Sequence, residues 1–235
     1  MNAADGKFKK RIIRGERTLD VEEMHILKPG ITWSPDGNQL AVAVKSGKSD
    51  AIIFFNLKTD KKEIKRFDIK GIFRPTWHPT ENIIAFIGND GFSSDIYLYD
   101  IDNDNLINYT NDWFSDDQVS WDSSGENLYF ISNRGTYTKI NSFHEINDSI
   151  AQNIDIEQYD IYSISINNNE MIRHTNTDYN ESYPQYSSDD KILAYISDKN
   201  GINNIYLKQD SYDKSVPITN ILTGITQLSW NVETD

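Results

Sequence analysis

The sequence contains no cysteine, which excludes a disulfide scaffold, a thiolate metal site and a cysteine nucleophile. Positive charge is scarce, since 23 Lys and Arg stand against 36 Asp and Glu and leave a net charge of −13. Nucleic acid and anionic membrane surfaces both need clustered cations, so this balance argues against either partner. No apolar run approaches the roughly 18 residues that a membrane span requires, so we expect no direct membrane insertion.

The first 17 residues are basic and polar, with neither an apolar core nor a small-residue cleavage site, so they are not typical of a signal peptide. We expect the protein to be cytoplasmic, or this chain to lack its own beginning. Aromatic residues are plentiful, since 13 Tyr, 10 Phe and 5 Trp are too many for a disordered acidic tail. The 235 residues therefore indicate one large domain, or two small ones, with a buried core.

The main positive signal is an internal repeat. Segment 31–37 reads ITWSPDG, and related segments follow along the chain, each with an aromatic anchor at the same position. The anchors are Trp33, Trp77, Trp121, Tyr186 and Trp230. They are separated by steps of 44, 44, 65 and 44 residues, and three equal steps are hard to obtain by chance. The longer step indicates a unit with 21 extra residues, an insertion that we place at 136–158.

Two further motifs keep the same register. Asp-Ile-Tyr begins at Asp95 and Asp160 and has a variant at Asn204, and a Thr-Asn pair closes three of the units. Each unit divides into four short apolar or alternating stretches, called strands a to d, which turn-forming residues separate. Four strands in a period of about 40–45 residues predict a β-propeller blade. Only the Asn-rich segment 139–158 offers room for a short helix.

The repeat resembles that of the TolB-type propeller family. Segment 33–37 (WSPDG) matches the family motif completely, and segment 89–97 and the pair 133–135 and 160–162 match its middle. The resemblance covers about residues 31–230, which is nearly the whole chain. Related repeats occur in periplasmic TolB, in tricorn-like proteases and in the propellers of prolyl-oligopeptidase and dipeptidyl-peptidase-type enzymes. The resemblance is therefore specific for the fold and poor for the function.

We accordingly predict an all-β propeller at 31–235, with blades beginning near residues 31, 75, 119 and 184 and a truncated one beginning near 225. Residues 1–30 are a lead-in, either an outer closing strand or the tail of an upstream domain. TolB-type propellers have six blades, whereas this chain has about four and the start of a fifth. We interpret it as part of a six-bladed propeller, with a closed four-bladed ring and a loose tail as the alternative.

Catalytic and cofactor signals are weak. No Gly-x-Ser-x-Gly elbow occurs, and the four histidines are scattered without a His-Glu-x-x-His motif, so we expect neither catalytic residues nor a cofactor. Asp100, Asp102 and Asp104 have the spacing that opens a calcium loop and are weak metal candidates. Asn105 and Asn111 stand where that loop needs its glycine and its bidentate glutamate, so a hairpin turn is the simpler interpretation.

The repeated residues also have structural interpretations. One aromatic anchor per blade at constant register is typical of core packing rather than of a ligand cage. Asp95 and Asp160 are expected to cap or orient a neighbouring turn. His78 replaces the serine of the Ser-Pro-Asp-Gly turn, so we expect it on the surface.

Strand alternation predicts which loops share a face. The a–b and c–d turns must lie on one face of the disc, and the b–c and d–a connections on the other, together with the insertion. We call the second the insertion-bearing face. Aromatic and arginine side chains are typical interface anchors, and the candidates here are Phe73, Arg74, Phe92, Trp113, Phe114 and Tyr179. The alternative is that they pack beneath their own loops.

The favoured function is a non-catalytic, TolB-like scaffold that binds a protein or peptide on its insertion-bearing face. A location in the bacterial periplasm or cell envelope rests on the resemblance alone. The alternative is a substrate-gating propeller of a serine or metallo-peptidase whose catalytic domain lies outside this chain. A calcium- or sugar-binding module is a third hypothesis.

Overall fold

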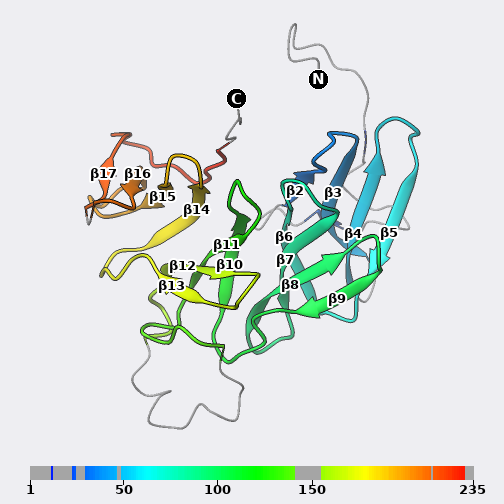
Figure 1. The fold of residues 1–235 in the computed structure, drawn as a ribbon, viewed down its shortest axis with the longest axis horizontal. Coiled ribbons are helices and arrows are strands. Elements are labelled where there is room, and N and C mark those ends of the chain that lie inside the picture. Colours follow the sequence, from blue (N-terminus) through cyan, green and yellow to red (C-terminus); the bar gives the residue numbers. More distant parts are fainter. Residues whose placement is uncertain are drawn as a thin grey trace, which may run out of the picture.

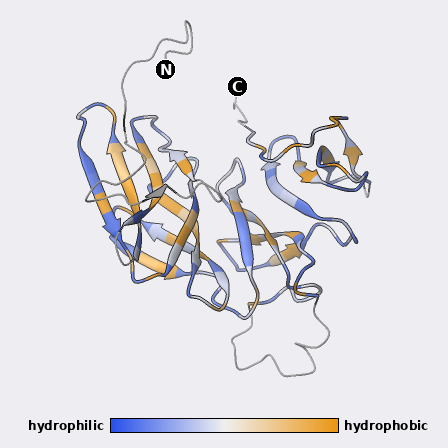
Figure 2. Ribbon diagram, turned by 180° about the vertical axis from the view of Figure 1, so that it is seen from behind, coloured by the Kyte–Doolittle hydropathy of each residue, from blue (hydrophilic) through white to orange (hydrophobic). Residues whose placement is uncertain are grey.

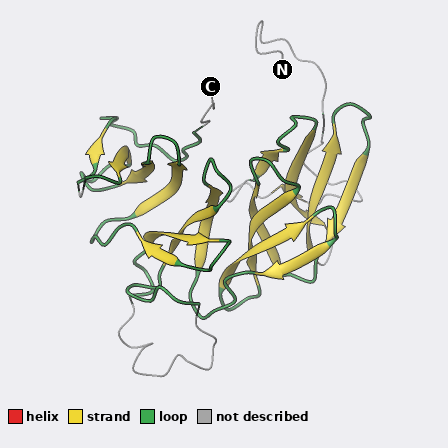
Figure 3. Ribbon diagram, in the orientation of Figure 1, coloured by secondary structure: helices red, strands yellow, loops and turns green. Residues whose placement is uncertain are grey.

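The computed structural model describes residue 12 and residues 23–24, 30–46, 49–140, 155–212 and 214–230. These residues form 17 β-strands and, within this part of the chain, no helix (Figure 3). The described residues accordingly include no helix long and apolar enough to cross a membrane. The predicted all-β class is confirmed.

The strands form four antiparallel sheets that follow one another around an arc, with blades 1 and 4 at its ends (Figure 1). Blade 1 consists of β1 (Glu23–Met24), β2 (Ile31–Trp33), β3 (Gln39–Ser46), β4 (Ser49–Asn56) and β5 (Lys62–Arg66). Blade 2 consists of β6 (Gly71–Trp77), β7 (Ile83–Asn89), β8 (Ser94–Asp100) and β9 (Asn105–Asn108).

Blade 3 consists of β10 (Asp116–Trp121), β11 (Asn127–Ser132), β12 (Asp160–Ser165) and β13 (Met171–Arg173). Blade 4 consists of β14 (Glu181–Ser187), β15 (Ile192–Ser197), β16 (Asn204–Gln209) and β17 (Val216–Pro217). Blades 2 to 4 are the four-stranded blades that the repeat predicts, and blade 1 has four such strands together with β1, which pairs with β3. Residues 225–230, expected to open a fifth blade, form no strand, and the expected insertion is described only up to residue 140 and from residue 155.

Three hydrophobic cores lie between consecutive blades. The ribbon coloured by hydropathy shows that hydrophobic residues gather in the blade strands (Figure 2). In β7, Ile84 and Phe86 pack toward blade 1, whereas Ala85 and Ile87 pack toward blade 3. Side chains alternate between the two faces of a strand, so each blade serves two interfaces. This double burial explains why the central strands are almost continuously apolar.

The constant register of the aromatic anchors has a packing cause, because Trp77, Trp121 and Tyr186 each lie against the preceding blade. The ring of Trp77 lies 5.9 Å from that of Phe54, and the ring of Tyr186 lies 4.6 Å from that of Tyr129. Trp77 is therefore buried, as expected. Trp33 departs from the expectation, since it is 57% exposed. No described blade precedes Trp33, so its indole lacks the partner that the later anchors have.

The motif residues tie each blade to the connection that leaves it. The hydroxyl oxygens of Thr110 and Thr175 accept the backbone N–H groups of Ile96 and Ile161 at 2.9 and 2.8 Å. The carboxylate of Asp95 accepts the N–H of Asp112 at 3.3 Å, and that of Asp160 accepts the N–H of a residue at the same offset. Buried N–H groups need such acceptors, so the motifs recur for structural reasons.

His78 is buried, contrary to the expected surface position. Its Nδ1 accepts the N–H groups of Thr80 and Glu81 at 3.2 and 2.9 Å, so Nε2 carries the proton. Nε2 then donates to the carbonyl of Gly125 in blade 3, at 3.1 Å. The imidazole also packs against Trp121, 4.7 Å away between ring centres. His78 thus joins the turns of two consecutive blades.

The inner strands carry a bulge at one repeated position. Register shifts occur at Arg74, Gln118 and Tyr183, whose φ angles of 51°, 56° and 52° are left-handed. Nη1 of Arg74 donates to the hydroxyl of Tyr183 at 2.9 Å, and Nε lies 3.0 Å from the carboxylate of Asp117. The first of these contacts joins β6 of blade 2 directly to β14 of blade 4.

Candidate partner-binding pocket

A hollow of about 440 Å³ opens on the insertion-bearing face, between blades 2 and 3. Its lining residues come from three separate connections, and they are Phe92, Ser93, Trp113, Ser115, Asn133, Ile156 and Tyr159. The connections are the β7–β8 loop, the β9–β10 connection and the two ends of the β11–β12 connection. The strand alternation predicted from the sequence brings these loops to one end of the blades. We call this hollow the Phe92 pocket.

The β7–β8 turn sets the direction of Phe92. Gly91 has a φ of 104°, a conformation that residues with a Cβ rarely adopt. The carboxylate of Asp90 accepts the N–H groups of Phe92 at 2.8 Å and of Ser93 at 3.2 Å. This tight turn holds Phe92 outward, with 90% of the residue exposed, and buries Ser93.

Asn133 holds the opposite wall. Its Oδ1 accepts the N–H of Ser115 at 2.9 Å, and its Nδ2 donates to the carbonyl of Ile156 at 3.3 Å. Trp113 packs edge-to-face on Phe114, with ring centres 5.6 Å apart. Hydrogen bonds of Asn133 therefore hold the β9–β10 and β11–β12 connections together behind the pocket.

A buried charge cluster lies beneath these loops. Arg134 is fully buried, and its guanidinium contacts Asp112 at 2.8 Å and Asp116 at 2.6 Å. Burial raises the pKa of Asp112 despite the opposing charge of Arg134. Burial also raises the pKa of Asp95 to about 6, with the charge of Asp116 adding to it and the hydrogen bond from Asn108 opposing it. The loops of this face are thus anchored by a buried group of ion pairs and hydrogen bonds.

The structure brings together two of the six partner-binding candidates, Phe92 and Trp113. Phe114 is fully buried behind Trp113 and is not available to a partner. Phe73 packs into the core between blades 2 and 3, and Arg74 lies in the hollow between the first strands of the blades, near Gln118 and Tyr183. Tyr179 is partly exposed elsewhere, with the ammonium of Lys199 5.9 Å from its ring centre.

The polar and insertion-derived members of the pocket belong to no recognisable binding motif in the sequence. Ser93, Asn133 and Tyr159 each stand in a loop that the repeat register locates, but nothing in that register shows that the three loops meet. Ile156 lies near the end of the insertion and carries no motif. Only the packing of blade 2 against blade 3 places them side by side.

The three weak metal candidates form a turn. The carboxylate of Asp100 accepts the N–H of Asn103 at 3.0 Å, Asp102 accepts the amide of Asn82, and Asp104 pairs with Lys65. The three carboxylates have different partners. Within the described residues, no group of three or more His, Asp or Glu side chains could hold a metal ion.

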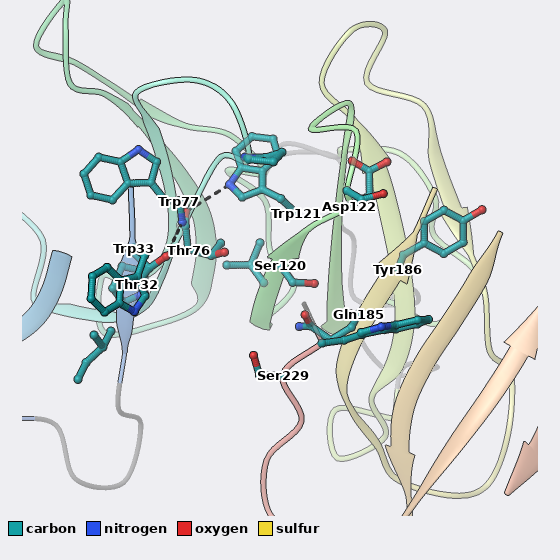
Figure 4. A pocket seen from close by; sticks show the side chains of 16 residues that line it. Thr32, Trp33, Thr76, Trp77, Ser120, Trp121, Asp122, Gln185, Tyr186 and Ser229 are labelled. Atoms are coloured by element: carbon teal, nitrogen blue, oxygen red, sulfur yellow. Dashed lines mark hydrogen bonds between the residues drawn. The ribbon is translucent and has the colours of Figure 1, made fainter. Parts of the chain in front are cut away.

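A second hollow, of about 420 Å³, lies where the aromatic anchors meet (Figure 4). Its rim includes Trp33, Trp121 and Tyr186, with Trp230 approaching from the C-terminal segment. The N–H of Trp77 donates to the hydroxyl of Thr32 at 2.9 Å, so polar contacts here join neighbouring inner strands. Because Trp77 and Trp121 are buried and these contacts join neighbouring strands, we interpret this hollow as a junction between blades rather than as a binding site.

Solved structures share this fold. TolB from Acinetobacter baumannii aligns with a TM-score of 0.61 and 19% identity, over 81% of this chain and 43% of its own. The putative TolB from Agrobacterium tumefaciens aligns with a TM-score of 0.63 and 19% identity, over 84% of this chain and 64% of its own. The tricorn protease aligns with a TM-score of 0.58 and 16% identity, over 83% of this chain and 22% of its own.

No protein-family model and no curated protein matches the chain. The structural likeness therefore defines the fold, which is that of TolB-like propellers. The chain spans less than two thirds of the length of either TolB structure. TolB proteins and a protease are both among the structures with this fold.

Proposed function

We propose that this chain is a non-catalytic, TolB-like scaffold that binds a protein partner on its insertion-bearing face, in a bacterial periplasm or cell envelope. The observation that carries the proposal is the Phe92 pocket, in which an almost fully exposed phenylalanine is held by an ordered turn beside Trp113 and Tyr159. The likeness to TolB structures supports the envelope location.

The physical argument is that Phe92 leaves apolar surface in water. Burying such a side chain stabilises a protein by about 1.5–3 kcal/mol, a gain that Phe92 does not make within this chain. The turn fixes the backbone of Phe92 before any partner arrives, so binding costs less ordering of the main chain there. Aromatic anchors in pre-ordered pockets are the residues that dominate protein interfaces.

A cross-linking experiment tests this proposal. A photo-reactive phenylalanine analogue replaces Phe92 in one variant and Tyr212, which is 65% exposed on the turn between β16 and β17, in another. We expect covalent adducts with a specific protein from position 92 and none from position 212, in cells of the source organism. Adducts confined to position 212, or none from position 92, would contradict the proposal.

A peptidase-associated propeller is the second candidate, because the tricorn protease shares the fold over 83% of this chain. The same cross-linking separates the two. Adducts that join position 92 to a peptidase domain would favour this candidate over the scaffold.

A further inference from the structure

We infer that the Phe92 pocket receives one apolar side chain of an extended, lysine- or arginine-bearing segment of the partner protein. This inference rests on the proposed function and names the chemistry of the partner at that same site. Three features carry it, namely the apolar walls, one unpartnered hydroxyl and the charge of the rim.

The walls select an apolar group. Phe92 is 90% exposed and Ile156 is 59% exposed, and both line the pocket with Trp113 and Tyr159. The volume of about 440 Å³ lies in the range of about 300–1,000 Å³ that is typical of sites for small groups. One large side chain and its neighbouring backbone fit such a space.

One lining residue, Ser93, has a hydroxyl group without a hydrogen-bond partner. Ser93 is 4% exposed, and its Oγ is buried without a partner. A buried hydroxyl without a partner is uncommon in folded proteins. An occupant that brings one donor or acceptor, such as a peptide backbone group, would satisfy it.

The remaining polar groups argue against a sugar. Both amide atoms of Asn133 are used within the loops. A polyhydroxylated ligand would need several polar partners, whereas Phe92, Trp113 and Ile156 line the pocket with apolar and aromatic surface. An apolar side chain carried by a peptide needs few polar partners and therefore fits this lining.

The rim is acidic. Asp90 is exposed and is fixed beside the pocket because its carboxylate accepts the N–H of Phe92, and the exposed Asp155 and Glu157 flank the lining residue Ile156 in the chain. Lys70 carries an opposing charge, with its ammonium 6.0 Å from the ring centre of Phe92. Because these carboxylates outnumber that ammonium and the chain has a net charge of −13, a cationic segment is the complementary partner.

Selection from a random peptide library tests the inference. The full 235-residue chain and its Phe92→Ser and Tyr212→Ser variants serve as baits in parallel. We expect peptides with an apolar residue flanked by lysine or arginine, recovered at least tenfold less well on Phe92→Ser and equally well on Tyr212→Ser. Enrichment of acidic or uncharged peptides, or recovery unaffected by Phe92→Ser, would overturn the inference.

Two further variants and one control variant test the separate roles of the acidic residues and of the Ser93 hydroxyl. Exchanging both Asp155 and Glu157 for lysine should remove the preference for basic peptides, whereas Asp189→Lys, on a turn of the opposite face, should leave it intact. Ser93→Ala should weaken the best peptide about threefold to tenfold, the size of one hydrogen bond, with an unchanged melting temperature. An unaltered charge preference in the double variant would refute the role of the rim.

This test can fail while the proposed function stands. Cross-links from position 92 to a protein, combined with an acidic peptide consensus, would retain the interaction face and reject the basic partner. A failure of both experiments would reject the function as well.

Discussion

At the scale of single residues, the least expected feature is the amount of buried charge around blades 2 and 3. Asp112 and Asp116 share one buried cation, Arg134, and Asp95 is buried close enough for the charge of Asp116 to raise its pKa. Burial of a carboxylate disfavours its charged form. The repeat assigns Asp95 a structural role, and its surroundings make that role dependent on pH.

Asp95 gives a prediction on stability against pH. Its folded pKa of about 6 lies above the ordinary aspartate value of 3.8, so the folded state holds the proton more tightly than the unfolded state. The associated stability is present below pH 3.8 and is lost as the pH rises through 6, by up to about 3 kcal/mol.

Asp95→Asn should flatten the melting temperature between pH 4 and 7, as measured by circular dichroism. Asparagine is tolerated at this repeat position, because Asn204 accepts the N–H of Ile221 there, at 2.8 Å. An identical pH profile in the two proteins would contradict the prediction.

At the scale of the elements, the blades depend on joints between their turns. Gly125 ends the a–b turn of blade 3 with a φ of 77°, and a Cβ built there would lie 2.3 Å from Nε2 of His78. Gly37 is the counterpart in blade 1, with a φ of 66° and no atom within 4 Å of its Cβ position. The two glycines share a left-handed backbone that would be strained for a residue with a Cβ, and they differ in the contact with a neighbouring blade.

Exchanging these glycines for alanine should separate the two effects. Gly37→Ala should cost about 1 kcal/mol for the left-handed backbone alone. Gly125→Ala should cost about 1–3 kcal/mol more, because the methyl group displaces His78 from its hydrogen bond with blade 3. Denaturant unfolding of the two variants measures the difference, and equal losses would show that the His78 joint contributes nothing.

At the scale of the whole molecule, the arc of blades decides which anchors are structural. Trp77 is 5% exposed because it packs on blade 1, whereas Trp33 has no described blade before it. The channel is meanwhile bridged by Arg74, which reaches Tyr183 in blade 4. Within the residues that the structure describes, the four blades therefore cohere through consecutive interfaces and through the contact of Arg74 with Tyr183.

Substituting alanine for the two tryptophans tests this arrangement. Trp77→Ala should cost about 3–5 kcal/mol, the usual loss for a buried aromatic residue. Trp33→Ala should cost less than about half as much, because its ring already contacts water. Guanidinium unfolding of both variants provides the comparison. Equal losses would indicate that in solution Trp33 is covered, as the later anchors are.

The repeat was predictable from sequence because its causes are local and periodic. Anchors such as Trp77 recur with three of their four steps equal to 44 residues because they pack on the blade before them. Thr110 recurs because strand c needs an acceptor for its first N–H groups. The exposure of Trp33 and the burial of His78 and Phe114 were not predictable. Those outcomes depend on which blade stands next to the residue, and the repeat motif is the same in either case.

The sequence by itself determined the all-β class, the four-stranded blades and the loops that share a face, because strand periodicity and turn chemistry act within about 44 residues. Only the tertiary structure decided that Phe92 and Trp113 line one pocket, that Phe114 lies buried behind it and that Ser93 forms its floor. The reason is that a pocket is made by the packing of one blade against the next, which joins loops that are far apart in the chain.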